Sequence, residues 1–139
     1  SLRIFAKLAG KLAASIRRLK YFEVREPQSL GQGCDSWYLI KDTQLTIIEE
    51  RMPAGTAETL HKTNKSRQFF FVLAGSATME HGGAVTTLVT GTGLEIPLGV
   101  PHRILNQSDT VLEFLVTSQP PSHADRVELT WSPEGSARS

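Results

Sequence analysis

Four side chains in this sequence are of types that could hold a metal ion or exchange protons. The stretch "HKTNKSRQ", residues 61–68, begins with His61, has Thr63 two places on and ends with Gln68, and His102 follows later in the chain. Imidazole binds transition metals and also serves as a general acid or base. Glutamine offers only a neutral amide oxygen, and threonine only a hydroxyl. The two histidines are therefore the strongest candidates for a site.

The segment that must position these residues has the pattern of an all-β fold. From about residue 30, runs such as "SWYLI", "TQLTIIEE", "QFFFVLAG" and "VLEFLVTS" are rich in β-branched and aromatic residues. Turn signals separate the runs roughly every eight to twelve residues, which is typical of a sandwich or barrel of short strands. Residues two apart in a strand point to the same side, so we expect His61 and Thr63 to share a face.

Residues 91–106, "GTGLEIPLGVPHRILN", form the more specific motif. The order is glycine, five residues, proline, one residue, glycine, two residues, histidine, three residues and asparagine, and the histidine is His102. This stretch resembles the second motif of the cupin superfamily at every fixed position. The resemblance covers roughly residues 36–120.

The stretch "GTAETLHKTNKSRQFFFVLAG" resembles the first cupin motif in part. Gly55, His61 and Gly75 keep the spacing of that motif. Thr63 stands where the motif has its second histidine, and Gln68 stands where it has glutamate. The usual cupin site, with three imidazoles and one carboxylate, is thus degenerate in this chain.

The resemblance implies an all-β double-stranded β-helix (jelly roll) over residues 30–120, as in small stand-alone bacterial cupins. In the cupin register the motif side chains converge in the barrel lumen. The ligand pocket that this implies contains His61, Thr63, Gln68, Phe71 and His102. The implied metal ligands are His61, Gln68 and His102, for iron, manganese, nickel or zinc.

Two states of this pocket stay open from the sequence. A divalent ion would lack a protein anion beside it, which is costly inside a barrel, unless an anionic ligand supplied the charge. Without a metal, the histidines would hydrogen-bond to water, Gln68 or a bound molecule. We therefore expect a protein that binds a small polar or anionic molecule. The alternative is a metal-dependent enzyme, isomerase-like or dioxygenase-like, that acts on a small sugar-like or carboxylate substrate.

Residues 1–22 are expected to form an amphipathic helix that precedes the barrel. Leucine, isoleucine and phenylalanine recur there at steps of three or four, and residues 1–20 carry six basic and no acidic side chains. The apolar stripe could pack on the body or on a second subunit, lie on an anionic membrane surface, or belong to a targeting segment. Because this stripe and the sheet edges both need cover, we predict a homodimer.

The remaining composition narrows the class of protein. After residue 20 the chain has 9 basic and 14 acidic residues, a balance that disfavours nucleic-acid binding. The single cysteine, Cys34, cannot form an internal disulfide, and no apolar run is long enough to cross a membrane. These features favour a cytoplasmic protein without an integral membrane segment. Residues 121–139, rich in proline and small polar residues, are expected to form a C-terminal tail.

Overall fold

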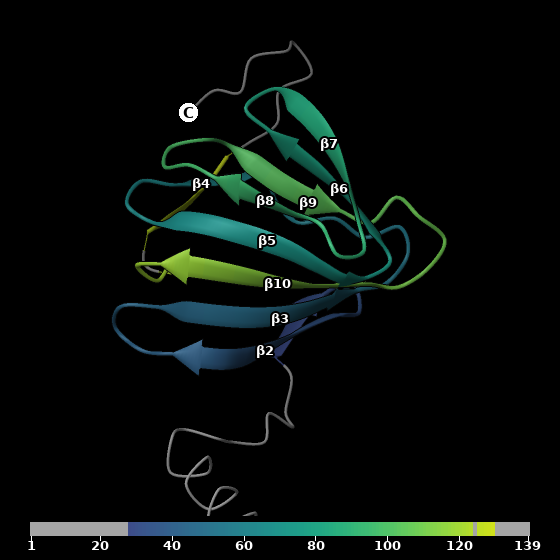
Figure 1. Ribbon diagram of the computed structural model, residues 1–139, viewed down its shortest axis with the longest axis horizontal. Coiled ribbons are helices and arrows are strands. Elements are labelled where there is room, and N and C mark those ends of the chain that lie inside the picture. Colours follow the sequence, from purple (N-terminus) through teal and green to yellow (C-terminus); the bar gives the residue numbers. More distant parts are fainter. Residues whose placement is uncertain (1–27, 124, 130–139) are drawn as a thin grey trace, which may run out of the picture.

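The computed structural model describes residues 28–123 and 125–129, which form two antiparallel β-sheets (Figure 1). The strands are β1 (Gln28–Gly31), β2 (Cys34–Lys41), β3 (Thr46–Met52), β4 (His61–Thr63), β5 (Arg67–Ala74), β6 (Ser76–His81), β7 (Ala84–Val89), β8 (Gly93–Ile96), β9 (His102–Leu105), β10 (Leu112–Gln119) and β11 (Arg126–Glu128). One sheet has the order β1-β2-β3-β10-β5-β8, and the other has the order β11-β4-β9-β6-β7. This arrangement confirms the all-β prediction and is that of a jelly roll.

The two sheets share one hydrophobic core because their strands alternate between buried and outward side chains. In β10, Leu112, Phe114, Val116 and Ser118 are buried, and the residues between them are half-buried. In β5, the buried side chains are those of Gln68, Phe70 and Val72. The inner side of the second sheet contributes Ala77, Met79, Leu88 and Ile104. The two-residue period of the sequence therefore decides which polar residues enter the barrel.

Asn106, the last fixed residue of the second motif, holds a loop together. Its side-chain nitrogen donates to the carbonyl oxygens of Met52 at 2.9 Å and Thr110 at 2.8 Å. Its side-chain oxygen accepts from the backbone nitrogen of Ser108 at 3.1 Å and from the Ser108 hydroxyl at 2.7 Å. These bonds join the end of β9 to β3 and to the start of β10, so the role of Asn106 here is structural.

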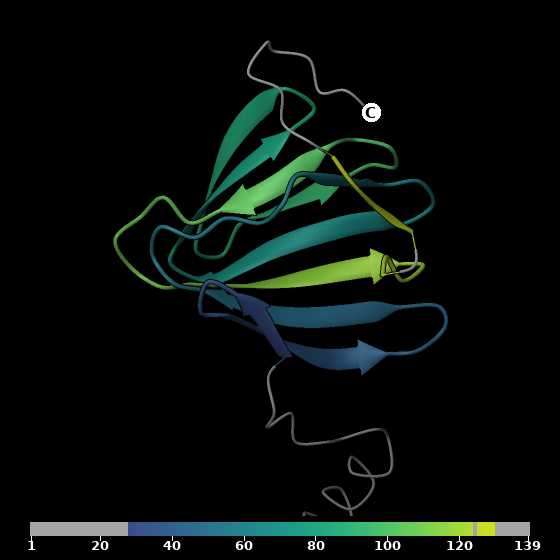
Figure 2. The same cartoon turned by 180° about the vertical axis from the view of Figure 1, so that it is seen from behind.

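The expected termini have different outcomes. The predicted helix over residues 1–22 lies outside the described residues. The range predicted as a C-terminal tail contains β11, which pairs with β4 and is drawn in yellow (Figure 2). The Asp125 carboxylate anchors this strand, since it accepts from the backbone nitrogens of Lys65 at 2.7 Å and Ser66 at 2.9 Å. No helix within the described ranges is long and apolar enough to cross a membrane.

The turn between β5 and β6 depends on Gly75. Its φ is +86°, and a Cβ added there would lie 2.5 Å from the carbonyl oxygen of Val111. Gly83 has a similar φ of +83°, yet an added Cβ would meet nothing within 4 Å. The two positions therefore separate backbone strain from steric conflict.

We expect Gly75→Ala to lower the free energy of unfolding by more than Gly83→Ala. Gly83→Ala should cost roughly 1–2 kcal/mol, the strain of an alanine with positive φ. Gly75→Ala adds a clash with backbone that cannot move away cheaply, so its loss should be at least twice as large. Urea denaturation of both variants measures the difference. Equal losses would contradict the steric argument.

Candidate functional site

His61 and His102 lie side by side within the barrel. They are direct partners across β4 and β9, their ring centroids are 4.3 Å apart, and the ring planes are inclined by 59°. His61 is 3% exposed and His102 is completely buried. Phe70 packs against the His102 ring edge-on, with centroids 5.7 Å apart. Two residues separated by about 40 positions in sequence thus form one imidazole pair.

Backbone carbonyl groups fix the orientation of both rings. Nδ1 of His61 lies 3.0 Å from the carbonyl oxygen of Thr59, and Nδ1 of His102 lies 2.9 Å from that of Val100. A carbonyl oxygen only accepts, so Nδ1 carries the proton in each neutral ring and Nε2 keeps its lone pair. Nε2 of His102 is buried without a hydrogen-bond partner among the described residues. Each ring therefore presents an acceptor nitrogen of the kind that binds metals or ligand donors.

Both imidazoles are held in the neutral form. Burial, the neighbouring His102 ring and the positive charge of Arg126 lower the pKa of His61 to about 3, against the hydrogen bond to Thr59. Burial also lowers the pKa of His102, and Arg126 acts in the same direction, whereas the bond to Val100 opposes it. At neutral pH the pair consequently carries no charge, and Nε2 of each ring is unprotonated.

Gln68 lies on the inner side of β5, and the two ends of its amide differ in hydrogen bonding. Its side-chain nitrogen donates to the hydroxyl of Ser118 at 3.0 Å, across the β5–β10 pairing, and to that of Ser122 at 3.4 Å. Its Oε1 is buried and has no hydrogen-bond partner among the described residues. The amide is thus oriented by serines and keeps an open acceptor, while no hydrogen bond joins it to either histidine within the described ranges.

The other two predicted pocket residues are placed differently. Thr63 is buried, and its hydroxyl donates to the carbonyl oxygen of Ser66 at 2.6 Å, which closes the turn between β4 and β5. Phe71 is on the opposite side of β5 from Gln68, because the two are an odd number of residues apart. Phe70 instead contacts the histidine pair. Strict alternation along "RQFFFVLA" places Phe70, rather than Phe71, on the same side of β5 as Gln68.

The donor set partly fits a divalent metal. Within the described residues no group of three or more histidine, cysteine, aspartate and glutamate side chains could hold an ion. Two neutral imidazoles with pinned Nδ1 atoms and one unpaired amide oxygen do supply three neutral ligand atoms. Such a set fits a borderline ion such as zinc or nickel weakly, since no anion offsets the charge.

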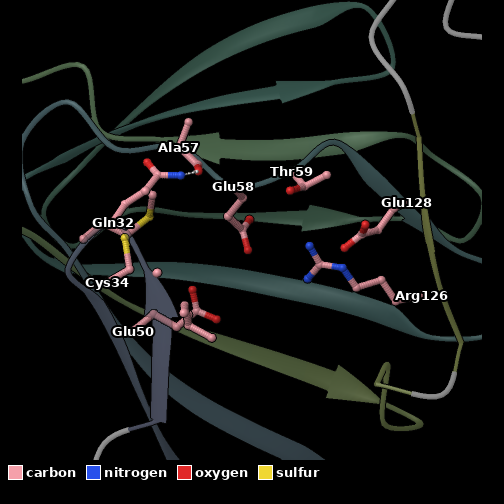
Figure 3. Close-up of a pocket in the computed structure, with 11 residues that line it drawn as sticks. Gln32, Cys34, Glu50, Ala57, Glu58, Thr59, Arg126 and Glu128 are labelled. Carbon is pink, nitrogen blue, oxygen red and sulfur yellow. Dashed lines mark hydrogen bonds between the residues drawn. The ribbon is translucent and has the colours of Figure 1, made fainter.

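A cavity of about 320 Å³ beside this region was not anticipated from the sequence (Figure 3). Glu50 on β3, Glu58 in the loop before β4, and Arg126 on β11 all line it. Burial raises the pKa of both glutamates; each also feels the positive charge of Arg126, which lowers it, and Glu58 further raises that of Glu50. Alternation along "TIIEERM" could have identified Glu50, which shares the inner side with Met52. No sequence pattern identified Arg126, because it lies in the range predicted to be a C-terminal tail.

Residues 48–118 match the family model described as "Cupin domain". The chain is 30% identical over 88 residues to the uncharacterized protein MJ1618 of Methanocaldococcus jannaschii, which covers 63% of this chain and 70% of that protein.

Among solved structures, an RmlC-like cupin from Shewanella frigidimarina superposes with a TM-score of 0.67 at 19% identity, over 76% of this chain and 92% of that one. KdgF from Halomonas sp. gives a TM-score of 0.64 at 18% identity, over 72% and 90%. At such identities these structures show a shared fold alone. The family match spans the strands that carry His61, Gln68 and His102, and with the jelly roll it establishes that this chain belongs to the cupin family.

Proposed function

We propose that this cupin binds a small polar molecule inside its barrel, at the face formed by His61, Gln68 and His102. The supporting observation is that, within the described residues, these side chains present hydrogen-bond acceptors and no unused hydrogen-bond donor. The Nδ1–H groups of both histidines donate to backbone carbonyl oxygens, and in the described part of the chain Oε1 of Gln68 and Nε2 of His102 have no hydrogen-bond partner. Unsatisfied buried acceptors each cost roughly 1–3 kcal/mol, so a ligand that donates to them is strongly favoured.

The acceptor-only surface restricts the ligand. A hydroxyl or amine can donate to Nε2 and to the amide oxygen directly. A carboxylate or phosphate cannot, because it offers acceptors to acceptors. An anionic ligand is thus compatible with this site only together with a metal ion. The anionic ligand and the divalent metal that the sequence led us to expect therefore require each other.

If a divalent metal is bound, His61, Gln68 and His102 are the residues that would hold it. The ion would supply the positive charge that an anionic ligand needs in this part of the barrel. The protein's own contribution is to keep both imidazoles neutral and both Nε2 atoms unprotonated, through burial and the bonds to Thr59 and Val100.

The metal proposal is tested by completing the ligand set. Thr63→His with Gln68→Glu should raise the affinity for zinc or nickel by roughly two orders of magnitude, about 2.8 kcal/mol. The physical reason is one added imidazole and one added negative charge. Titration calorimetry on the chelator-free protein measures the affinity. Thr63→His with Gln68→Leu is the matched control, which adds an imidazole without the charge and should gain less. An unchanged affinity in the double variant would mean that these positions do not converge.

The neutral state of His61 gives a pH-dependent prediction. A histidine whose folded-state pKa lies below its unfolded value of roughly 6.5 binds fewer protons when folded, so stability falls as the pH drops below that value. With a folded pKa of about 3, His61 alone should account for a loss of about 2 kcal/mol between pH 7 and pH 5.

His61→Gln should remove this part of the pH dependence. Comparing wild type and variant by urea denaturation at pH 7 and pH 5 cancels the contributions of other groups, including the buried glutamates, whose raised pKa values act in the opposite sense. His123→Gln, at an exposed histidine, is the control and should leave the dependence unchanged. The same slope in His61→Gln and wild type would show that His61 binds protons equally in the folded and unfolded states, and so that its pKa is not lowered by folding.

The predicted homodimer has a candidate contact on β7, the edge strand of the second sheet. Val85 is 66% exposed and Val89 is 54% exposed, and both point to the same side of the strand. Sedimentation equilibrium should report a dimer for the full chain, and Val85→Lys with Val89→Lys should shift it to monomer. A monomeric wild type at tens of micromolar, where ordinary interfaces associate, would refute the dimer; a dimer that survives both substitutions would exclude this contact.

A further inference from the structure

The cavity beside the histidine pair is lined by charged groups from elements far apart in the sequence. Glu50 from β3, Glu58 from the loop before β4, and Arg126 and Glu128 from β11 face it, with Cys34 and Met52 on the apolar side. Figure 3 shows the carboxyl groups of Glu50 and Glu58 directed into one space, with the Arg126 guanidinium at another side of it. At about 320 Å³, the cavity lies at the small end of the range for ligand sites.

Glu50 is the buried polar group that points to a ligand. Its side chain is only 8% exposed, and Oε2 has no hydrogen-bond partner among the described residues. Its cross-strand neighbours are Ser36 on β2 and Phe114 on β10. An acid in these surroundings is costly to keep unless something in the cavity donates to it.

The other charged groups do not satisfy Glu50. Glu58 accepts from the backbone nitrogen of Ile104 at 3.3 Å through Oε1. Within the described ranges, no ion pair or hydrogen bond joins Arg126 to Glu50 or Glu58. The groups thus face a common space without a direct bond between the carboxyl groups and the guanidinium in the described part of the chain, which leaves them available to separate charges on a ligand.

The balance of charge selects the class of ligand. Three carboxyl groups and one guanidinium line the cavity, so a cation is favoured near the glutamates, and Arg126 offers donors that suit a carboxylate. We propose that this cavity binds a small aminocarboxylate, with its ammonium group between Glu50 and Glu58 and its carboxylate on Arg126. The histidines are not among the lining residues, so this proposal rests on a different set of side chains from the one above.

Binding should change the protonation of the glutamates. Burial favours their neutral forms, whereas an ammonium group beside them favours the charged forms. The charged and titratable groups around the cavity are Glu50, Glu58, Glu128, Arg126 and the Cys34 thiol. An amine ligand should therefore release protons on binding, whereas a hydroxyl in the same place should release none.

The test uses ligands that differ in one group. Glycine, 4-aminobutyrate and 6-aminohexanoate vary the distance between the charges, and butylamine, butyrate and 4-hydroxybutyrate each lack one of them. Titration calorimetry of the full chain, in two buffers of different ionisation enthalpy, gives both affinity and proton release. At least one aminocarboxylate should bind ten-fold more tightly than all three single-group analogues, with release of protons.

Variants locate the binding. Glu50→Gln keeps the shape of the side chain and should fold normally, and Arg126 is exposed, so Arg126→Gln should also fold. Each should weaken the aminocarboxylate at least ten-fold, whereas Glu49→Gln, on the other side of β3, should have no effect. His123→Gln, at an exposed histidine that does not line the cavity, should leave this affinity unchanged.

Several results would overturn the proposal. One is the absence of binding by every aminocarboxylate at millimolar concentration. Another is butylamine binding as tightly as the aminocarboxylates with no effect of Arg126→Gln, which would indicate a site for amines alone. Equal losses in Glu49→Gln and Glu50→Gln would show that the ligand binds elsewhere, and tighter binding of 4-hydroxybutyrate without proton release would identify a site for hydroxyls.

Discussion

The cost of placing polar groups between two sheets governs the interior of this protein. Strand alternation directs Glu50, His61, Gln68 and His102 into a space otherwise filled by methionine, phenylalanine and aliphatic side chains. A buried polar group must find a partner or lose its charge. The histidines lose theirs, and both glutamates are shifted towards the neutral form, in each case with burial as the largest cause. The chemistry of the barrel follows from this desolvation.

The same cost separates structural from functional polar residues. Asn106 is completely buried and uses both ends of its amide in bonds that tie loops to strands. Thr63 likewise uses its hydroxyl in a hydrogen bond that closes a turn. Gln68, His102 and Glu50 each have one buried atom that finds no hydrogen-bond partner over residues 28–123 and 125–129. Residues that are fully satisfied stabilise the fold, whereas the unpaired atoms mark surfaces where a ligand can compensate for the lost hydrogen bonds.

The sequence predicted the architecture because two kinds of signal agreed. Alternation and glycine-rich turns indicated an all-β protein, and the motif around His102 indicated the cupin barrel, which the family match confirms. The proximity of His61 and His102 follows from strand pairing, which the motif carries implicitly. Phe71 was placed in the pocket although alternation puts Phe70 there.

The cavity could not be predicted in the same way. It is assembled from β1, β2 and the turn between them, β3, the loop before β4, and β11, and no local sequence pattern shows which distant segments meet. Glu50 was visible as an acid on an apolar side of a strand, but Arg126 lies in a stretch whose composition resembles a loose tail. Short strands such as β11 form through pairing with distant strands rather than through local propensity, so they are hard to predict from the sequence.

The short strand β11 also links the binding of a ligand in the cavity to the local opening of the strand itself. Among the described residues it forms three residue pairs with β4, extended by a bond from the Leu129 nitrogen to the Leu60 carbonyl oxygen at 2.8 Å, and its side chains form one wall of the cavity. A segment with so few pairs opens locally at a much lower free energy than the core strands do. Anything that bridges Arg126 to the opposite wall must therefore resist that opening, and the rate at which β11 detaches sets an upper limit on how long an occupant stays. Asp125, just before β11, ties this strand to the turn after β4 and so holds that wall of the cavity in place.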